Sequence, residues 1–165
     1  MHRTLTVLNE LERAGLLRRY AIGGAIGALF YMDQFETEDQ DVFILLGTEV
    51  NPLTPLAPLH AELERRGFRL DGPYVVIHGV PVQFLPTWNA LVEEAVDEAR
   101  AVSYESVSTR VLTAEHLAAI MVQTGRPKDR SRLLSLREQA DLNGARLTDI
   151  LTRHDLQERF TSWTR

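Results

Sequence analysis

The sequence predicts a mixed α+β (α/β) fold with a helical C-terminal part. Up to residue 112, short apolar segments typical of strands alternate with amphipathic helical segments, and every segment after it is helical. The 165 residues are 44% hydrophobic, which suffices to bury the core of one domain. We therefore expect an α/β core over residues 1–112, with residues 113–165 packed onto it as helices in a single compact unit.

The composition excludes several classes of protein. Without cysteine, the chain has no disulfide scaffold, no zinc-thiolate site and no cysteine nucleophile. No apolar run reaches the roughly 20 residues of a membrane span, and none follows the basic start as in a signal peptide. We expect a cytoplasmic protein without a membrane partner. The net charge of −5 argues against general coating of nucleic acid, but not against a local site.

The N-terminal elements follow from spacing and glycines. Leucines at helical spacing predict a first amphipathic helix that ends near Gly15. Residues 20–22 form a short apolar strand, and residues 25–32 a helix buried on most sides. The continuous apolar run over residues 41–46 is typical of a central strand covered on both faces.

The middle of the chain alternates turn residues with apolar runs. Three prolines over residues 51–58 predict a loop, which leads into a helix over residues 59–66. Gly67 ends that helix. Three strands with tight turns follow, over residues 68–70, 74–78 and 80–85.

The C-terminal elements are mainly helical. The sequence predicts an acidic helix over 91–101, a strand over 107–112 and a helix capped by Thr113 that ends at Gly125. Pro127 stands in the favoured first position of the next helix, which reaches about residue 140. One or two short helices complete the chain between residues 147 and 163.

Two local features together predict chemistry. The glycines of Ile22-Gly23-Gly24 stand where a strand meets a helix, so that backbone N–H groups can approach a phosphate closely. Asp39 and Asp41 lie two residues apart at the start of the central strand and therefore project from the same face. Paired carboxylates beside a phosphate-binding loop suit Mg²⁺ with a nucleotide.

These residues resemble the nucleotidyltransferase superfamily, which has the polymerase β-like fold. Its signature is a hydrophobic residue with Gly-Gly, then a helix, then an Asp-x-Asp pair on the next strand. Ile22-Gly23-Gly24 and Asp39-x-Asp41 match it, and Thr37 matches a Thr-x-Asp-x-Asp variant. Together with Gly125-Arg126-Pro127-Lys128-Asp129, followed by Arg132-Leu133, this resembles small bacterial abortive-infection and type IV toxin nucleotidyltransferases. The resemblance implies a mixed sheet flanked by helices.

The resemblance also implies site residues and partners. Asp39 and Asp41 would be catalytic and hold Mg²⁺, with Mn²⁺ as an alternative ion. The nucleotide-binding residues would be Gly23, Gly24, Thr37, Arg126 and Lys128. Asp129 is expected to act as a helix-end or salt-bridge residue. The implied partners are an NTP, an RNA (tRNA) or protein acceptor and an antitoxin.

The sequence departs from the family pattern at one critical position. The third carboxylate of the family stands in a hydrophobic run on a later strand, and the corresponding residue here is Gln83. A neutral amide cannot act as a base and is a poor ligand for a second Mg²⁺. Asp71 and Glu36 are alternative third carboxylates. The spacer between the glycines and Asp39 is also slightly long, and apolar residues 120–122 replace a family lysine.

Three interpretations follow. The first is an Mg²⁺-dependent enzyme that transfers a nucleotidyl group from an NTP to RNA or protein, in a toxin–antitoxin or phage-defence setting. The second is a decayed relative that binds a nucleotide or a partner as a regulator, since fold does not fix function. The third is an unrelated α/β domain with ordinary turns. We interpret the histidines as structural, the acidic face around Glu94 as solvated, and Trp88 and Trp163 as packing residues.

Overall fold

A seven-stranded mixed sheet forms the centre of the computed structural model, which describes residues 1–32, 39–47 and 50–165. The strand order is β3-β4-β5-β2-β1-β7-β6. The strands are β1 (Arg19–Ile22), β2 (Gln40–Leu45), β3 (Arg69–Asp71), β4 (Tyr74–Ile77), β5 (Val80–Pro86), β6 (Arg100–Tyr104) and β7 (Val107–Val111). The β2–β5 and β1–β7 pairs are parallel, and the other pairs are antiparallel. The expected mixed sheet is therefore confirmed.

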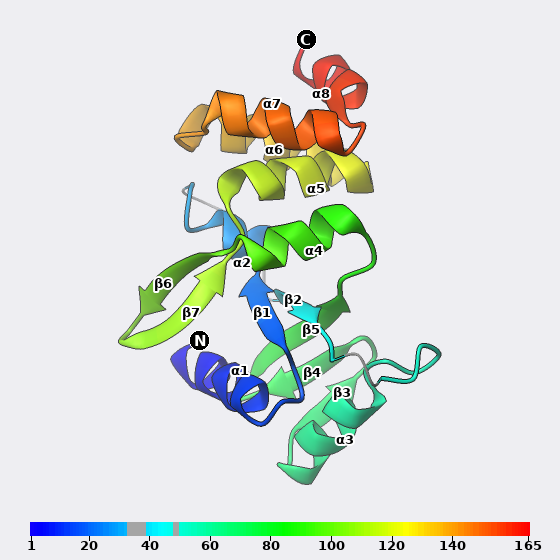
Figure 1. The fold of residues 1–165 in the computed structure, drawn as a ribbon. Helices are drawn as coiled ribbons and strands as arrows, with labels where there is room; N and C mark the ends of the chain where they lie inside the picture. The colour runs from blue at the N-terminus through cyan, green and yellow to red at the C-terminus, as the bar shows by residue number, and fades with distance from the viewer. Residues whose placement is uncertain (33–38, 48–49) are drawn as a thin grey trace.

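Helices cover both faces of this sheet (Figure 1). On one side lie α1 (His2–Arg13) and α3 (Ala57–Arg65). The short α2 (Gly24–Ala28) follows β1 and precedes β2 along the chain. On the other side α4 (Ala90–Asp97) packs against β1 and β2. Beyond it lie α5 (Ala114–Thr124), α6 (Pro127–Gln139), α7 (Gly144–Arg153) and α8 (Gln157–Thr164). Within the described ranges, no helix has the length and apolarity to span a bilayer.

The central strand β2 separates two apolar cores, as its continuous apolar run predicts. Val42 and Ile44 face the core under α1 and α3, whereas Phe43 and Leu45 face the core formed with α4 to α8. Because side chains alternate along a strand, Asp41 shares the face of Phe43. The strand therefore presents one carboxylate at the margin of the second core.

Most predicted helix ends are confirmed. The hydroxyl of Thr113 accepts a hydrogen bond from the backbone N–H of His116 at 3.3 Å, so Thr113 caps α5. Gly125 ends α5 with φ of +74°, and Pro127 begins α6. The predicted helix over residues 25–32 is shorter, because after Ala28 the N–H of Tyr31 donates to Ala28 in a tighter three-residue turn.

The prediction of one helix over residues 91–101 is wrong beyond residue 97. Residues 100–104 instead form β6, which pairs antiparallel with β7 through a turn at Glu105 and Ser106. Both turn residues have positive φ, 45° and 67°, which matches the twist of a tight hairpin. Pairing with β7 therefore overrides the helix propensity of Ala101.

Candidate functional site

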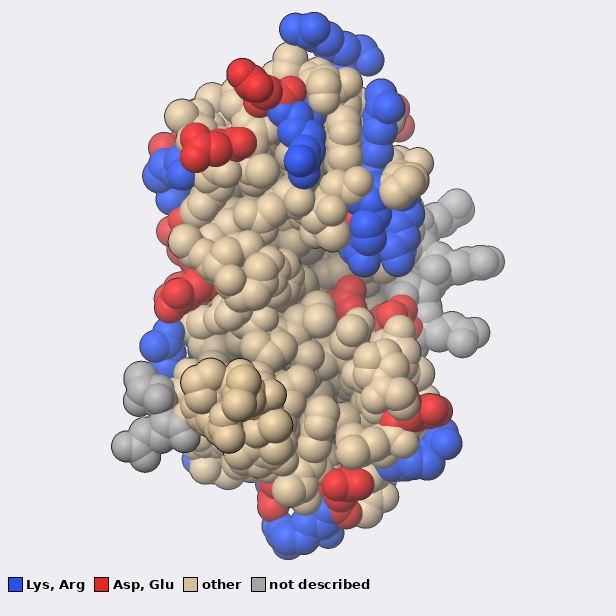
Figure 2. All heavy atoms as spheres, turned by 90° about the vertical axis from the view of Figure 1, so that its right-hand side faces the viewer, with Lys and Arg blue, Asp and Glu red and all other residues tan. Residues whose placement is uncertain are grey.

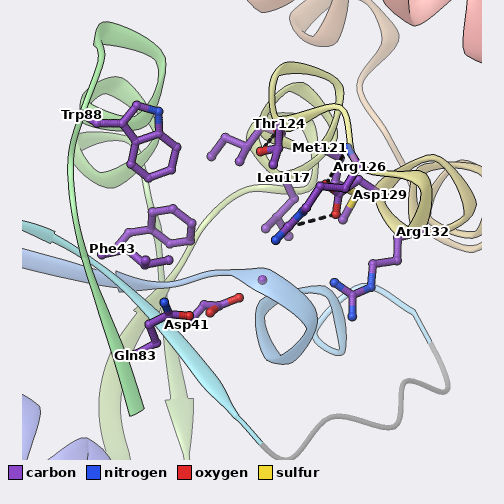
Figure 3. A pocket seen from close by; sticks show the side chains of 13 residues that line it. Asp41, Phe43, Gln83, Trp88, Leu117, Met121, Thr124, Arg126, Asp129 and Arg132 are labelled. Carbon is purple, nitrogen blue, oxygen red and sulfur yellow. Dashed lines mark hydrogen bonds and ion pairs between the residues drawn. The ribbon is translucent and has the colours of Figure 1, made fainter. Parts of the chain in front are cut away.

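The candidate site is a cavity of about 210 Å³ at the sheet face that carries Asp41. Gly24 and Asp41 line it from the β1–α2 junction and from β2, and Gln83 lines it from β5 (Figure 3). Arg126 and Arg132 approach from α6. Figure 2 shows the surface hollowed here, with a group of Lys and Arg side chains facing acidic ones across the hollow. Segments far apart in the sequence thus meet at one site.

Asp41 lies directly against Gly24. A Cβ atom on Gly24 would come within 1.9 Å of Asp41 Oδ2, and Gly24 has φ of +55°. The preceding Gly23 donates its backbone N–H to the carbonyl of Asp41 at 3.0 Å. A Cβ on Gly23 would lie 2.3 Å from the ring of Phe43. Both positions therefore require glycine, because any side chain would displace Asp41 or Phe43.

Asp39 lines a neighbouring cavity and not this one, although its charge acts on Asp41. The hydroxyl of Tyr74 donates to Asp39 Oδ2 at 3.4 Å, and the charge of Asp39 raises the pKa of Tyr74. Both residues line the second cavity together with Asp71, whose carboxylate pairs with Arg69 at 3.1 Å. Asp71, an alternative third carboxylate, therefore lies on the Asp39 side and not in the cavity with Asp41. Glu36, the other alternative, and Thr37 lie outside the described residues.

The surroundings of Asp41 favour a cation beside it. Burial raises the pKa of this carboxyl, and the neighbouring charge of Asp39 raises it further. Arg126, Arg132 and Lys128 act in the opposite direction, but the net shift is upward. Ionised Asp41 is therefore incompletely compensated by the protein itself, and a bound positive charge would stabilise it.

The start of α6 supplies the positive side of the cavity. Arg126 Nε donates to Asp129 Oδ2 at 2.7 Å, and the backbone N–H of Arg126 donates to the same atom at 3.3 Å. Asp129 is buried, so this capping arrangement holds Arg126 at the cavity, and the expectation that Asp129 is a helix-end residue is confirmed. Lys128 is exposed and does not line the cavity, but its charge reaches Asp41. Arg132, further along α6, also lines the cavity.

Gln83 lies beside Asp41, as the resemblance to the family implies. The parallel pairing of β2 with β5 places Asp41 opposite Gln83, and both side chains line the cavity. Apart from Asp41, the acidic residue lining the cavity is Asp129, which is bound to Arg126. The carboxylates of Asp41 and Asp39 with the amide oxygen of Gln83 suit a single Mg²⁺, because this ion takes few protein ligands and completes its shell with water and phosphate oxygens. Within the described parts of the chain, these groups do not suffice for a second ion.

Sequence reasoning did not assign the aromatic side of the cavity. Trp88 was expected to be a packing residue, but 55% of it is exposed and it lines the cavity opposite the arginines (Figure 3). Its ring centroid lies 5.9 Å from that of Phe43. Trp88 lies in the short connection between the end of β5 at Pro86 and the N-cap of α4 at Asn89.

A second acidic cluster lies between α4 and α5, apart from the cavity lining. Ligand atoms of Glu94, Glu98 and His116 lie within 4.8 Å of one another, the spacing of a metal site among the described residues. However, Arg146 binds Glu98 at 2.7 Å and Arg153 binds Glu94 at 3.0 Å, so both carboxylates already have cationic partners. We interpret this cluster as an ion network that joins α4, α5 and α7.

Glu94 corrects the expectation of a solvated acidic face. It accepts hydrogen bonds from Arg153, from His116 at 3.1 Å and from His154 at 3.0 Å. Burial raises the pKa of Glu94, but these hydrogen bonds outweigh it and hold the pKa at about 2. Only 18% of its side chain is exposed. His116 and His154 are structural, as expected, because both form hydrogen bonds to Glu94.

The chain is similar in fold to known protein structures. No protein-family model and no curated protein sequence matches the chain. Among solved structures, an antigenic nucleotidyltransferase-like protein from Paracoccidioides brasiliensis is similar, with a TM-score of 0.55 and 14% identity, over 97% of this chain and 91% of that chain.

The antibiotic-resistance factor ANT(2'')-Ia is similar in two structures. Its solution structure matches with a TM-score of 0.53 and 18% identity, over 96% of this chain and 92% of that chain. Its crystal structure in complex with adenylyl-2''-tobramycin matches with a TM-score of 0.52 and 15% identity, over 95% and 98%. The chain therefore has the nucleotidyltransferase fold.

Proposed function

We propose that the cavity binds an NTP with Mg²⁺ and that the protein transfers the nucleotidyl group to an acceptor. One observation carries the proposal: the partly buried carboxylate of Asp41, in contact with Gly24, faces Arg126 and Arg132 within one cavity. An anionic site for a cation and a cationic site for phosphates are thus adjacent. A metal–triphosphate complex has this same arrangement of charge.

Each charged residue has a role in this proposal. Asp39 and Asp41 hold Mg²⁺, or Mn²⁺ in its place, and the bound ion would offset phosphate charge during transfer. The two glycines leave the backbone accessible beside Asp41 for phosphate oxygens. Arg126, Arg132 and Lys128 provide fixed positive charge for the β- and γ-phosphates. These charges also stabilise the pyrophosphate that leaves.

The reaction is a substitution at the α-phosphorus. The acceptor hydroxyl oxygen forms a bond to this phosphorus while the bond to the bridging oxygen breaks, and pyrophosphate leaves. Gln83 has no proton-accepting group at neutral pH, so the proton of the acceptor goes to water. We expect turnover to be slow for this reason, since general-base catalysis typically contributes about 10²- to 10⁴-fold.

The acceptor and setting follow from resemblance alone. The sequence motifs favour an RNA such as tRNA, or a protein, as acceptor, and a cytoplasmic toxin–antitoxin or phage-defence system with an antitoxin partner. The structurally similar ANT(2'')-Ia was solved with adenylyl-2''-tobramycin, so a small polyhydroxylated acceptor belongs in the same assay. The acceptor hydroxyl would approach past Asp39, where the second cavity opens.

A second candidate function rests on Gln83. A neutral amide beside Asp41 suits a protein that keeps nucleotide binding and has lost turnover. Such a protein would act as a regulator that binds a nucleotide or a partner. It would bind the NTP with Mg²⁺ but release no pyrophosphate.

One assay separates the two functions. The protein is incubated with α-labelled NTPs, Mg²⁺ or Mn²⁺, and in turn a tRNA pool, total protein and an aminoglycoside. Transfer of label by the wild type and its loss in Asp41→Asn support the enzyme. Asp97→Asn is the matched control, because Asp97 is exposed on α4 and does not line the cavity. Binding without label transfer supports the regulator, and label transfer that persists in Asp41→Asn contradicts the proposal.

A further inference from the structure

The cavity has an apolar wall opposite its cationic one. Trp88 and Phe43 form one side, and Arg126 and Arg132 point in from the other (Figure 3). Apolar side chains of α5, among them Leu117, close the space between them. If the charged side takes the phosphates, the remainder of the same nucleotide extends toward the aromatic side.

Trp88 is exposed but held in place. Its ring leans on Phe43 at a centroid distance of 5.9 Å and an interplanar angle of 38°. The backbone N–H of Thr87 donates to the carbonyl of Ile44 at 3.0 Å. On the other side, Asn89 Nδ2 donates to Gln123 Oε1 at 2.7 Å, and Asn89 also caps α4. Because both neighbours are anchored, the exposed indole has a defined position beside the cavity.

The spacing of residues along β2 sets the distance between the aromatic side of the cavity and Asp41. Phe43 lies two residues after Asp41 on the same face of the strand, a separation of roughly 7 Å. One ribose separates the α-phosphate of a nucleotide from its base. An α-phosphate held near Asp41 therefore leaves the base within reach of the aromatic pair.

We infer that Trp88, supported by Phe43, is the platform on which the nucleobase of the substrate stacks. This inference rests on the proposed function and adds the part of the substrate that the charged residues do not touch. Exposed aromatic rings that stack on bases accept any base, because every base presents a π-face. The site recognises the face of the base and not its edge.

The lining of the cavity supports this lack of base discrimination. Among the described residues lining it, the uncharged polar side chains are Gln83, beside Asp41, and Thr124. The hydroxyl of Thr124 already donates to the carbonyl of Ile120 at 2.8 Å. Reading a base edge needs donors and acceptors in pairs, which this wall lacks. Purine and pyrimidine NTPs both bind, and purines bind more tightly through their larger stacking area.

Fluorescence tests the stacking directly. The chain has two tryptophans, so Trp163→Phe leaves Trp88 as the sole indole reporter. This variant is titrated with α,β-methylene ATP, α,β-methylene CTP and inorganic tripolyphosphate, each with Mg²⁺. The methylene analogues quench Trp88 emission, whereas tripolyphosphate leaves the emission unchanged and competes with them. Equal quenching by tripolyphosphate would overturn the stacking.

Calorimetry gives a second measurement that does not depend on the fluorophore. Trp88→Ala weakens binding of the methylene analogues about 5- to 140-fold, and Trp88→Phe retains most of the affinity. Tripolyphosphate binds wild type and both variants alike. Leu53→Ala is the control for loss of an exposed apolar side chain, since Leu53 is 89% exposed and lies outside the cavity.

The outcomes separate this inference from the proposed function. Equal affinity of Trp88→Ala and wild type for the nucleotide analogues overturns the stacking platform and leaves the phosphate site intact. Absence of binding of both tripolyphosphate and the analogues overturns the proposed function, and the stacking with it. Circular dichroism verifies that each variant is folded.

Discussion

Gln83 lies opposite Asp41 in the parallel pairing of β5 with β2, and both side chains line one cavity. Neighbouring positions on parallel strands project to the same face, so the amide and the carboxylate share one environment. The amide adds no charge to Asp39 and Asp41. Among the residues that the structure describes, the site therefore has the donors for one divalent ion and not for two.

Gln83→Glu tests this arrangement by adding the absent charge. We expect the variant to bind Mn²⁺ about tenfold more tightly, because ligand charge strengthens binding of hard cations, and to transfer label faster. Mn²⁺ titration calorimetry and the label-transfer assay measure both effects. Gln157→Glu makes the same change on α8, away from the cavity, and should alter neither. Unchanged or weaker Mn²⁺ binding by Gln83→Glu would argue against a metal beside this strand pair.

Asp41→Asn is expected to stabilise the metal-free protein. Burial and Asp39 raise the pKa of Asp41, so its ionisation in the folded state costs stability once the pH exceeds the ordinary aspartate range. The neutral amide removes that cost at pH 7. Thermal unfolding in EDTA should show a higher Tm, by about 2–4 °C for each kcal/mol. With Mg²⁺ the difference in Tm between the variant and the wild type should shrink or change sign, because only the wild type is stabilised by binding the ion. A lower Tm of the variant in EDTA would contradict this electrostatic account.

Gly24→Ala should disrupt the site. The new methyl group would overlap Asp41 Oδ2, and the positive φ of this position strains any L side chain. We expect roughly 1–3 kcal/mol of destabilisation, and NTP binding weakened by more than about tenfold. Gly144→Ala provides the comparison, since a Cβ there meets open space at the start of α7. If both alanine variants behave alike in calorimetry and unfolding, close contact between Gly24 and Asp41 is not what the site requires.

Glu94→Gln should destabilise the packing of α4 against α5 and α7. The depressed pKa of Glu94, about 2, means that its ion pairs contribute stability above the ordinary glutamate pKa and lose it as the pH falls toward 2. At pH 7 we expect a loss of about 1–3 kcal/mol, which shrinks on acidification. Urea unfolding at pH 7 and pH 3 measures the difference. Asp97→Asn on the same helix is the control, and a pH-independent difference would be inconsistent with ionised Glu94.

Gln40→Met should stabilise the protein. Gln40 is 1% exposed, and among the described groups neither its Oε1 nor its Nε2 has a hydrogen-bond partner. An unsatisfied buried amide costs about 1–3 kcal/mol, and methionine has a similar length without the polar atoms. Thermal unfolding should show a rise in Tm of about 2–4 °C for each kcal/mol recovered. A lower Tm would indicate that the amide has a stabilising role.

The sequence predicted those parts of the fold that depend on local signals. Thr113, Gly125 and Pro127 mark helix ends through their own backbone and side-chain chemistry, and each is confirmed. The start of β6 escaped prediction because Arg100 and Ala101 favour a helix by their own propensity and gain their strand conformation from pairing with β7. In a hairpin, pairing between the strands outweighs the helix propensity of individual residues.

The candidate site also combines residues that local sequence signals predict with residues whose position depends on tertiary packing. Gly24 and Asp41 could be placed from the sequence, because the glycines mark the strand–helix junction and strand alternation fixes the face of Asp41. Gln83 could be placed only through the resemblance to the family, since alternation does not tell which strands pair. Trp88 could not, because its exposure depends on how α5 and the β5–α4 turn bound the cavity. The position of Arg132 depends similarly on how α6 approaches the sheet.

The most direct test is to locate a manganese ion by anomalous diffraction in crystals grown with Mn²⁺ and α,β-methylene ATP. We expect an anomalous peak coordinated by Asp39 and Asp41, with the triphosphate beside Arg126 and Arg132. A peak at the Glu94, Glu98 and His116 cluster alone, with no density for nucleotide in the cavity, would contradict it.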